Sequence, residues 1–393
     1  MDRSIFDEEH EMFRDSVRSF MKNEIGPHEE RWNEQGMVDR EAFLKAGEMG
    51  LLCMWVPEEY GGIGMDDFRY EQIVMEETTR FGDIGAFFTL HSRLVAPYIG
   101  TFGTEEQKQR WLPKCVSGEH ILAIAMTEPG TGSDLSGIRA KAEDKGDHFL
   151  LNGSKTFISN GILADLVIVA ARTDSGGSRG LSLFVVERGM AGFERGKNLD
   201  KMGLKSQDTA ELFFNNVKVP KENLLGELNR GFYHLMHGLA EERLIVSVGF
   251  LANAQAAFDA TLEYVQDRKV FGKPIADFQN TRFKLAEMQT ELDVAGAFVD
   301  RCVEEHNKGR LTAEDAAKAK LWTSEMENRI TDECVQLHGG NGYMMEYEVC
   351  RRHASARVSR IYAGTSEIMK EIISRSLGID PRKKSKSPKK DAA

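Results

Sequence analysis

One short segment combines residue types that could bind an anionic or flavin-like ligand. Positions 125–134 read Ala-Met-Thr-Glu-Pro-Gly-Thr-Gly-Ser-Asp and follow the apolar run 121–124 directly. A turn of this kind at the end of a strand presents backbone N–H groups and hydroxyl donors to a ligand. On its own the segment also fits an ordinary surface loop, so its interpretation depends on motifs further along the chain.

The elements that must position this segment fall into three regions. Residues 1–122 carry apolar side chains at helical spacing and predict an all-α domain. Residues 123–232 contain short apolar runs between turn residues and predict a β-barrel-like middle domain. Long helical stripes with short breaks occupy residues 233–380 and predict a four-helix bundle. The fold class expected is therefore α+β, with three domains.

Two local patterns give further expectations. In the middle region, Asn152-Gly153 separates two apolar runs, a pattern typical of a hairpin with a two-residue turn. Residues 381–393 are rich in lysine and serine and predict a solvated, disordered basic tail.

Composition excludes several classes of protein. The chain has 393 residues, of which 41% are hydrophobic and 29% charged, as expected of a water-soluble protein. No apolar run approaches the roughly 18 residues of a membrane span. The net charge of −11 argues against nucleic acid as a partner, since phosphate binding needs a basic face. An anionic substrate would need a locally basic site.

The five cysteines indicate neither a metal site nor a disulfide framework. They are scattered, odd in number and without a Cys-x-x-Cys pair. The N-terminal residues are acidic and lack a signal or transit pattern. We therefore expect a cytoplasmic protein, or one of the mitochondrial matrix if a targeting segment has been removed.

Five motifs, in this order along the chain, resemble those of the acyl-CoA dehydrogenases, closest to the long-chain type. They are Thr-Glu-Pro-Gly at 127–130, Lys-Thr-Phe-Ile-Ser-Asn-Gly at 155–161, Arg-Lys-Val-Phe-Gly at 268–272, Gln-Leu-His-Gly-Gly-Asn-Gly-Tyr at 336–343 and Tyr-Ala-Gly-Thr-Ser-Glu at 362–367. The likeness extends from about residue 7 to residue 378.

The resemblance implies FAD-dependent α,β-dehydrogenation of a fatty acyl-CoA thioester to the trans-2-enoyl-CoA, a step of fatty acid β-oxidation. A base removes the α-proton while the β-hydrogen leaves as hydride to flavin N5. The flavin is the electron sink, and the protein supplies orientation and polarisation. An electron-transfer flavoprotein is the electron acceptor that the resemblance implies.

The resemblance also implies which residues contact FAD in the middle domain. Thr127 donates to the ring, and Phe157 stands where the family has a tryptophan that covers the flavin. By its residue type alone, Phe157 also fits the core of a strand. The positions implied in this region are Ile124, Ala125, Met126, Thr127, Ser133, Phe157, Ile158 and Ser159.

A second set of FAD positions lies in the C-terminal region. Arg268 suits a pyrophosphate, although an exposed helix arginine is also a common salt-bridge partner. Gln279 and the segment 336–340 match adenine and ribose contacts made across a subunit interface, which implies a homo-oligomer, typically a homotetramer. The positions implied here are Arg268, Gln279, Gln336, Leu337, His338, Gly339, Gly340, Thr365, Ser366 and Glu367.

The sequence departs from many family members at the position of the catalytic base. Those members carry the base as glutamate in Tyr-Glu-Gly-Thr, where this chain has Ala363. The long-chain and isovaleryl branches instead place a glutamate directly before an arginine at the start of the bundle. Glu242 precedes Arg243 in this way, and we predict that Glu242 is the base.

Glu241 is the competitor for this role. Successive helix residues point about 100° apart, so only one of the two carboxylates can face the substrate α-carbon. Burial beside an apolar acyl chain would raise the pKa of the base and make it a stronger base toward a weak carbon acid. A pair of solvated helix charges is the alternative interpretation.

Other positions match the substrate side of the family's site. Ala363 can still supply a backbone N–H to the thioester oxygen, and Gly364 leaves room for the thioester. Phe87 and His91 are expected at the far end of the acyl tunnel, where the bulk of Phe87 weakens a long-chain preference. The implied substrate positions are Ser133, Tyr233, Arg243, Ala363 and Gly364.

Three alternative functions are compatible with the sequence. Two are enzymes with the same fold, and the third is a protein without catalytic activity. The first two are a branched-chain acyl-CoA dehydrogenase and an acyl-CoA oxidase. The third is a scaffold without catalytic activity, which the intact flavin motifs disfavour. The sequence does not distinguish the length or branching of the acyl chain.

Overall fold

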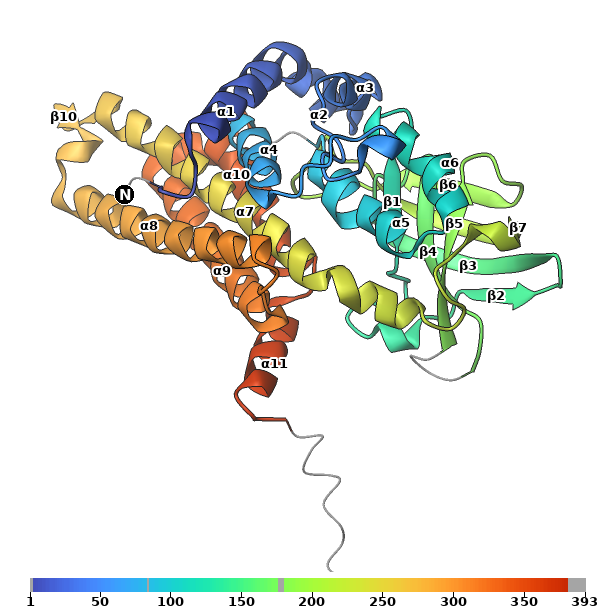
Figure 1. Ribbon diagram of the computed structural model, residues 1–393. Coiled ribbons are helices and arrows are strands. Elements are labelled where there is room, and N and C mark those ends of the chain that lie inside the picture. The colour runs from blue at the N-terminus through green and yellow to red at the C-terminus, as the bar shows by residue number, and fades with distance from the viewer. Residues whose placement is uncertain (1–2, 83–84, 176–179, 381–393) are drawn as a thin grey trace, which may run out of the picture.

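A computed structural model describes residues 3–82, 85–175 and 180–380 of the protein (Figure 1). A helical N-terminal region and a helical C-terminal region flank a central sheet, so the predicted fold class is confirmed. The predicted tail, residues 381–393, lies outside the described residues.

The N-terminal helices are packed around their own apolar cluster. Trp32, Phe43 and Phe88 are among its fully buried side chains. Each of the longer helices begins at a capping side chain; Thr104, for example, accepts the backbone N–H of Gln107 at the start of α6. The helices are α1 (Glu8–Phe20), α2 (Glu29–Gln35), α3 (Glu41–Glu48), α4 (Phe68–Phe81), α5 (Ala96–Phe102) and α6 (Glu105–Val116), with a π-helical turn at Leu90–Val95 before α5.

An eight-stranded sheet forms the middle of the molecule. Its order is β6-β7-β3-β2-β4-β5-β8, with β1 paired in parallel to β4. The central strands β4 and β5 are buried along almost their whole length, which explains their continuous apolar sequences. The strands are β1 (Leu122–Ala125), β2 (Lys141–Asp144), β3 (His148–Ser159), β4 (Leu166–Arg172), β5 (Leu181–Glu187), β6 (Phe193–Asn198), β7 (Thr209–Pro220) and β8 (Leu224–Leu225).

The hairpin predicted at Asn152-Gly153 is wrong. Strand β3 runs through both residues, and its pairing with β7 shifts register between Leu151 and Gly153. Gly153 has a φ of 139°, and a Cβ there would come within 2.7 Å of Ala140. The Asn-Gly pair therefore marks a β-bulge with a close backbone approach and not a turn.

Three long helices and two short ones make up the C-terminal bundle. Helix α7 runs from the sheet to the far end of the bundle, where a small β9–β10 hairpin leads into α8 (Figure 1). The place of a fourth long helix is taken by two short ones. The elements are α7 (Gly231–Asp267), β9 (Lys269–Val270), β10 (Lys273–Pro274), α8 (Gln279–Asn307), α9 (Ala313–His338), α10 (Glu348–Ala356) and α11 (Ser366–Ser376).

Helix α7 is long and apolar enough to cross a membrane, but it serves as the core helix of this bundle. Most of its apolar stretch is buried inside the protein. It packs against α9, α8 and α4. Its apolar composition is therefore explained by packing within the protein.

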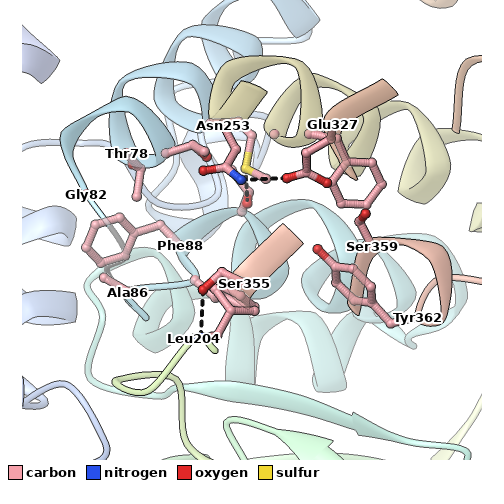
Figure 2. Close-up of a pocket in the computed structure, with 16 residues that line it drawn as sticks. Thr78, Gly82, Ala86, Phe88, Leu204, Asn253, Glu327, Ser355, Ser359 and Tyr362 are labelled. Carbon is pink, nitrogen blue, oxygen red and sulfur yellow. Dashed lines mark hydrogen bonds between the residues drawn. The ribbon is translucent and has the colours of Figure 1, made fainter. Parts of the chain in front are cut away.

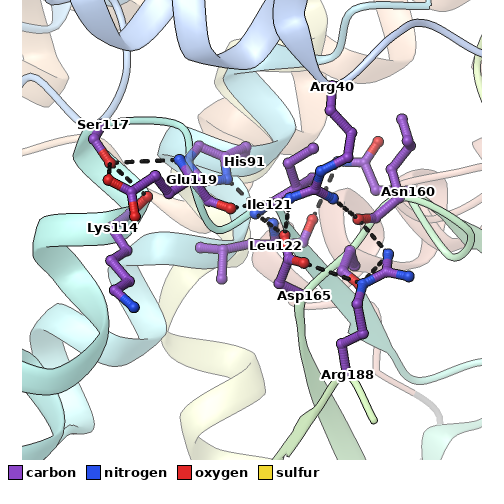
Figure 3. A network of polar contacts seen from close by, with 12 residues as sticks. Arg40, His91, Lys114, Ser117, Glu119, Ile121, Leu122, Asn160, Asp165 and Arg188 are labelled. Atoms are coloured by element: carbon purple, nitrogen blue, oxygen red, sulfur yellow. Dashed lines mark hydrogen bonds and ion pairs between the residues drawn. The ribbon is translucent and has the colours of Figure 1, made fainter.

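A polar network fixes β1 between the N-terminal helices and the sheet (Figure 3). Asp165 accepts the backbone N–H of Ile121 at 2.9 Å and pairs with Arg40 at 2.7 Å and Arg188 at 3.1 Å. His91 accepts the N–H of Leu122 at 3.2 Å. The strand that leads into the 125–134 turn is therefore held from both sides.

Candidate functional site

The turn after β1 is built around one buried carboxylate, that of Glu128. Its two oxygens accept the backbone N–H groups of Arg139 at 2.7 Å and Ala140 at 2.9 Å. Lys155, from β3, donates to the same carboxylate at 2.9 Å and to the carbonyl of Met126 at 3.0 Å. The turn is therefore fixed to β3 and to the chain beyond it.

Both members of this ion pair have shifted pKa values. Lys155 has no solvent exposure, and burial lowers the pKa of its ammonium to about 8, with Glu128 opposing that shift. The pKa of Glu128 is lowered despite its burial, since Lys155 and the two amides stabilise the charged form. This carboxylate is a fixed anion with a structural role.

The outer surface of the turn is open to a ligand. The N–H groups of Gly130, Gly132 and Ser133 have no acceptor among the residues that the structure describes. Phe157 lies close by, because Thr156 donates its backbone N–H to the carbonyl of Thr127 at 3.0 Å.

Phe157 has the backbone strain of a functional position. Its φ is 58° and its side chain is 69% exposed, so it does not belong to the core of β3. A positive φ at a bulky residue costs about 1–3 kcal/mol and persists only where surrounding structure holds it. Here a register shift in β3 between Lys155 and Ile158 turns the ring outward. The result is an aromatic face beside the turn.

Glu242, in the first half of α7, is buried and has one hydrogen-bond donor in the part of the chain that the structure describes. The Tyr98 hydroxyl, from α5, donates to its Oε1 at 2.9 Å. Burial raises the pKa of Glu242 to about 7, while Tyr98 and Arg243 oppose the shift. A carboxylate of this kind can exchange a proton near neutral pH.

The neighbouring Glu241 faces a different set of side chains. Its carboxylate lies 3.2 Å from the guanidinium of Arg93 and 3.6 Å from the ring of His306. Arg93 also lies 3.7 Å from the fully buried Glu71. The two adjacent glutamates therefore point to different parts of the molecule, as the geometry of a helix requires.

The residues of α7 on either side of Glu242 belong to two apolar clusters that also involve predicted motifs. On one side, Leu235 and Tyr98 belong to the cluster against which Met126 packs. On the other, Leu244 and Ile245 belong to the cluster against which Ala363 packs. Helix α7 therefore shares one apolar cluster with Met126 of the turn after β1 and another with Ala363.

The segment at Ala363-Gly364 is a tight turn with a left-handed backbone. The φ values are 51° at Ala363 and 90° at Gly364. Lys320, buried in α9, donates to the carbonyls of Ser359 and Gly364, both at 2.7 Å. Thr365 then caps α11 by accepting the N–H of Ile368. Lys320 thus sets the conformation of a segment 44 residues away.

The remaining substrate-side predictions fall in different surroundings. Arg243 is buried, and its Nε has no hydrogen-bond partner among the described residues. Tyr233 is 47% exposed, with the guanidinium of Arg230 over its ring. Ser133 is exposed in the turn after β1.

The second set of predicted cofactor residues is divided between two places. Arg268, Gln279 and the segment 336–340 lie at the end of the bundle that carries the β9–β10 hairpin, opposite the sheet (Figure 1). Thr365, Ser366 and Glu367 lie at the start of α11. A single chain does not bring Arg268 and Gln279 to the turn after β1.

The far end of the bundle has an exposed cation and exposed apolar side chains. The Arg268 side chain is exposed and pairs with no carboxylate within the described ranges. Phe271 is 96% exposed and Tyr343 80%. The ring of Tyr264 stacks on that of His338 with centroids 4.0 Å apart and holds the 336–340 segment against α7.

A cavity with about 80 Å³ of room for water-sized molecules lies between α4, α7 and α9, and Phe87 lines it (Figure 2). His91, which we expected beside Phe87, does not line it. His91 is fully buried, with Nε2 at 2.9 Å from the carbonyl of Cys115, and burial lowers the pKa of its ring to about 4. Its role is to connect α6 to β1.

Several residues of this site carried no role in the sequence. Tyr98, Lys155 and Lys320 each fix a site segment from a distant part of the chain. Lys155 and its partner Glu128 do lie within two of the recognised motifs. Nothing in the sequence indicates that they form a buried ion pair, because they are 27 residues apart. Tyr98 and Lys320 could have been found only from the tertiary fold.

Comparison with known proteins places this site in a family context. Three domain descriptions match in succession, namely the acyl-CoA dehydrogenase N-terminal domain at residues 7–119, the middle domain at 123–217 and the C-terminal domain at 229–378. The mitochondrial long-chain specific acyl-CoA dehydrogenase of Mus musculus is 48% identical over 96% of this chain and 88% of its own.

Two solved structures share the fold. The crystal structure of an acyl-CoA dehydrogenase from Geobacillus kaustophilus has a TM-score of 0.94 and 50% identity, covering 96% of this chain and all of that one. A glutaryl-CoA dehydrogenase from Mycobacterium smegmatis in complex with FADH2 has a TM-score of 0.88 and 30% identity, with 95% of each chain covered.

Proposed function

The chain belongs to the acyl-CoA dehydrogenase family, an enzyme family with FAD as cofactor, and from that premise we propose that it dehydrogenates a fatty acyl-CoA with Glu242 as the base. The product is the trans-2-enoyl-CoA, as in fatty acid β-oxidation. The buried carboxylate of Glu242, on a helix that shares apolar clusters with Met126 and with Ala363, supports this proposal.

The residues present fit FAD. Three backbone amides that have no acceptor among the described residues form, with the outward-facing ring of Phe157, a surface that a flavin would cover. Arg268 and Gln279 of the second set are exposed at the other end of the bundle, and Arg268, which has no carboxylate partner among the described residues, suits a pyrophosphate. When bound, FAD supplies the hydride acceptor of the reaction.

The chain's own residues supply the proton chemistry. Glu242 accepts the α-proton, and Tyr98 holds the carboxylate in place by its hydrogen bond. Ala363 has no carboxylate and cannot be the base. Its backbone N–H can still donate to the thioester oxygen as negative charge develops there. Lys320 keeps the turn at 363–364 in its left-handed conformation.

Glu241 is a poorer choice for the base. Its carboxylate lies within ion-pair distance of Arg93 and His306, so it already has partners and is directed away from Tyr98 and the cluster that contains Met126. Glu242 has no such cation at hydrogen-bond distance among the described residues. The difference in surroundings favours Glu242.

We further propose a homo-oligomer, of the homotetrameric type, that completes the cofactor site across subunits. The exposed Arg268 and Gln279 cannot serve the turn of their own chain, and exposed Phe271 and Tyr343 at the same end suit burial against a second copy. The electron acceptor that we propose is an electron-transfer flavoprotein. The compartment is aqueous, the cytoplasm or the mitochondrial matrix.

The experiment is an anaerobic titration of the purified, flavin-containing protein with acyl-CoAs of increasing chain length. We expect bleaching of the flavin absorbance by at least one straight-chain acyl-CoA. Bleaching by branched acyl-CoAs alone would replace the fatty acyl proposal, and rapid reoxidation of the reduced enzyme by oxygen would identify an oxidase. A purified protein that binds no flavin would overturn the proposal.

A further inference from the structure

The cavity lined by Phe87 has a polar end that the proposed reaction does not use. Apolar side chains such as Met75 and Phe250 line it. The polar side chains of Asn253, Glu327 and Tyr362 line it as well, and Figure 2 shows the hydrogen bond between Asn253 and Glu327. A fatty acyl chain that ended in a methyl group would place no hydrogen-bonding atom there.

Helix α7 connects this cavity to the proposed base. Gly249 and Asn253, seven and eleven residues after Glu242, share its face of the helix and lie about 10 Å and about 16 Å further along the axis. Both line the cavity, and so does Tyr362, the neighbour of Ala363. The cavity is therefore placed where the distal end of an acyl chain would lie if its α-carbon were at Glu242.

Glu327 has an unused hydrogen-bonding oxygen at this polar end. The side chain is 3% exposed, and its Oε1 accepts from the Asn253 amide at 2.7 Å. Its Oε2 has no partner among the described residues. Ser359 lies beside it but donates its hydroxyl to the carbonyl of Ala356 at 2.7 Å. Buried polar atoms of native proteins nearly always have a partner, so this one points to a guest.

Two hydroxyl groups of the cavity wall also have only weak hydrogen-bond acceptors. Thr78 and Thr89 donate to methionine sulfurs, at 3.8 Å and 3.2 Å, and a thioether is a weak acceptor. The cavity therefore combines a free carboxyl oxygen with hydroxyl groups that lack good acceptors.

The charges around the cavity select a neutral guest. A carboxylate guest would be repelled by Glu327 whenever that carboxyl group is ionised. An ammonium guest would be opposed by the guanidinium of Arg352, which donates to Asn253 Oδ1 at 2.9 Å. Burial raises the pKa of Glu327 to about 8, and a protonated carboxyl gives no attraction to a cation. A hydroxyl group can donate to Glu327 when it is ionised and can accept from it when it is protonated.

We propose that this cavity receives a hydroxyl group at the distal end of the acyl chain, with Glu327 as the specificity-determining residue. The inference rests on the proposed function, because it assumes that the acyl chain extends from Glu242 along α7. The preferred substrates are thus acyl-CoAs that are hydroxylated at or next to the last carbon.

The test compares kcat/KM for pairs of acyl-CoAs of equal chain length that end in a methyl or a hydroxyl-bearing carbon, over a range of lengths. A site built to bond a hydroxyl rejects the analogue without it strongly, and we expect a preference of at least about tenfold at the length that reaches Glu327. Glu327→Gln keeps the shape and hydrogen-bonding capacity and should retain part of the preference.

Glu327→Leu should remove the preference and raise kcat/KM for the methyl-ended partner. Glu314→Gln, a partly exposed change on the same helix, is the matched control and should leave the ratio unchanged. Equal kcat/KM for both partners at every length in the unaltered enzyme would overturn the inference. So would a preference that Glu327→Leu leaves intact. Failure of every acyl-CoA to react would instead overturn the proposed function.

Discussion

Glu128, in the turn after β1, and Glu242, in the first half of α7, are both buried, with 7% and 8% of their surface exposed. Glu128 receives a lysine ammonium and two backbone N–H groups, and its pKa is lowered. Glu242 receives one phenol, and its pKa is raised to about 7. The two pKa values move in opposite directions because desolvation dominates at Glu242, whereas the lysine and the two amides outweigh it at Glu128.

The comparison separates a carboxylate that holds structure from one that can do chemistry. A carboxylate with three donors is held in the charged form, and losing any of these charge-assisted hydrogen bonds costs free energy. A carboxylate with one neutral donor remains close to protonation at neutral pH. We expect substitutions in the first region to change stability and substitutions in the second to change the reaction.

The largest effect is expected from Glu242→Gln. General base catalysis contributes about 10²–10⁴-fold, so the rate of flavin reduction by acyl-CoA should fall by that factor while the flavin stays bound. Anaerobic stopped-flow measurement of flavin bleaching gives this rate. Normal bleaching in this variant would show that Glu242 is not the base.

Lys155→Met should chiefly change stability. It leaves Glu128 buried without its cation, and breaking a buried pair in this way costs about 3–5 kcal/mol of unfolding free energy. Chemical denaturation measures the loss. The double variant Lys155→Met/Glu128→Gln should recover part of it. An unchanged midpoint in the single variant would mean that the pair does not hold the turn.

Tyr98→Phe should move the pH dependence of the reaction. The base must be ionised, so kcat/KM should rise with pH through about 7 in the unaltered enzyme. The Tyr98 hydrogen bond stabilises the ionised form, and its removal raises the pKa of Glu242. The rising limb should therefore shift to higher pH, with activity lost at low pH and retained at high pH. A shift to lower pH would contradict the contact.

The smallest effect is expected from Glu241→Gln. Arg93 keeps Glu71 as a partner, and an ion pair that is partly exposed contributes about 0–1 kcal/mol. Flavin reduction should stay within a few-fold of the unaltered rate. A loss as large as that expected for Glu242→Gln would exchange the roles of the two glutamates.

Much of the fold could be predicted because apolar periodicity follows secondary structure directly. The alternation of helical and strand textures predicted the order of the three regions. Asn152-Gly153 misled because an Asn-Gly pair between apolar runs has the same local pattern in a turn and in a bulge. Only the pairing of β3 with β7 distinguishes the two.

The candidate site likewise has parts that could be predicted from local sequence and parts that could not. The motifs from the 127–130 turn to the 362–367 segment could be recognised because they are contiguous in the chain. The partners that set their chemistry are not contiguous, since Tyr98 lies 144 residues before Glu242 and Asn253 lies 74 before Glu327. No local pattern encodes such a pair.

The sequence by itself determined the family, the cofactor class and the order of the domains, because each of these depends on contiguous motifs or on periodicity. It also limited the choice of base to two adjacent glutamates. The tertiary structure decided how each buried carboxylate is partnered. Proton affinity depends on the donors and charges within a few ångströms, and folding alone brings those groups together.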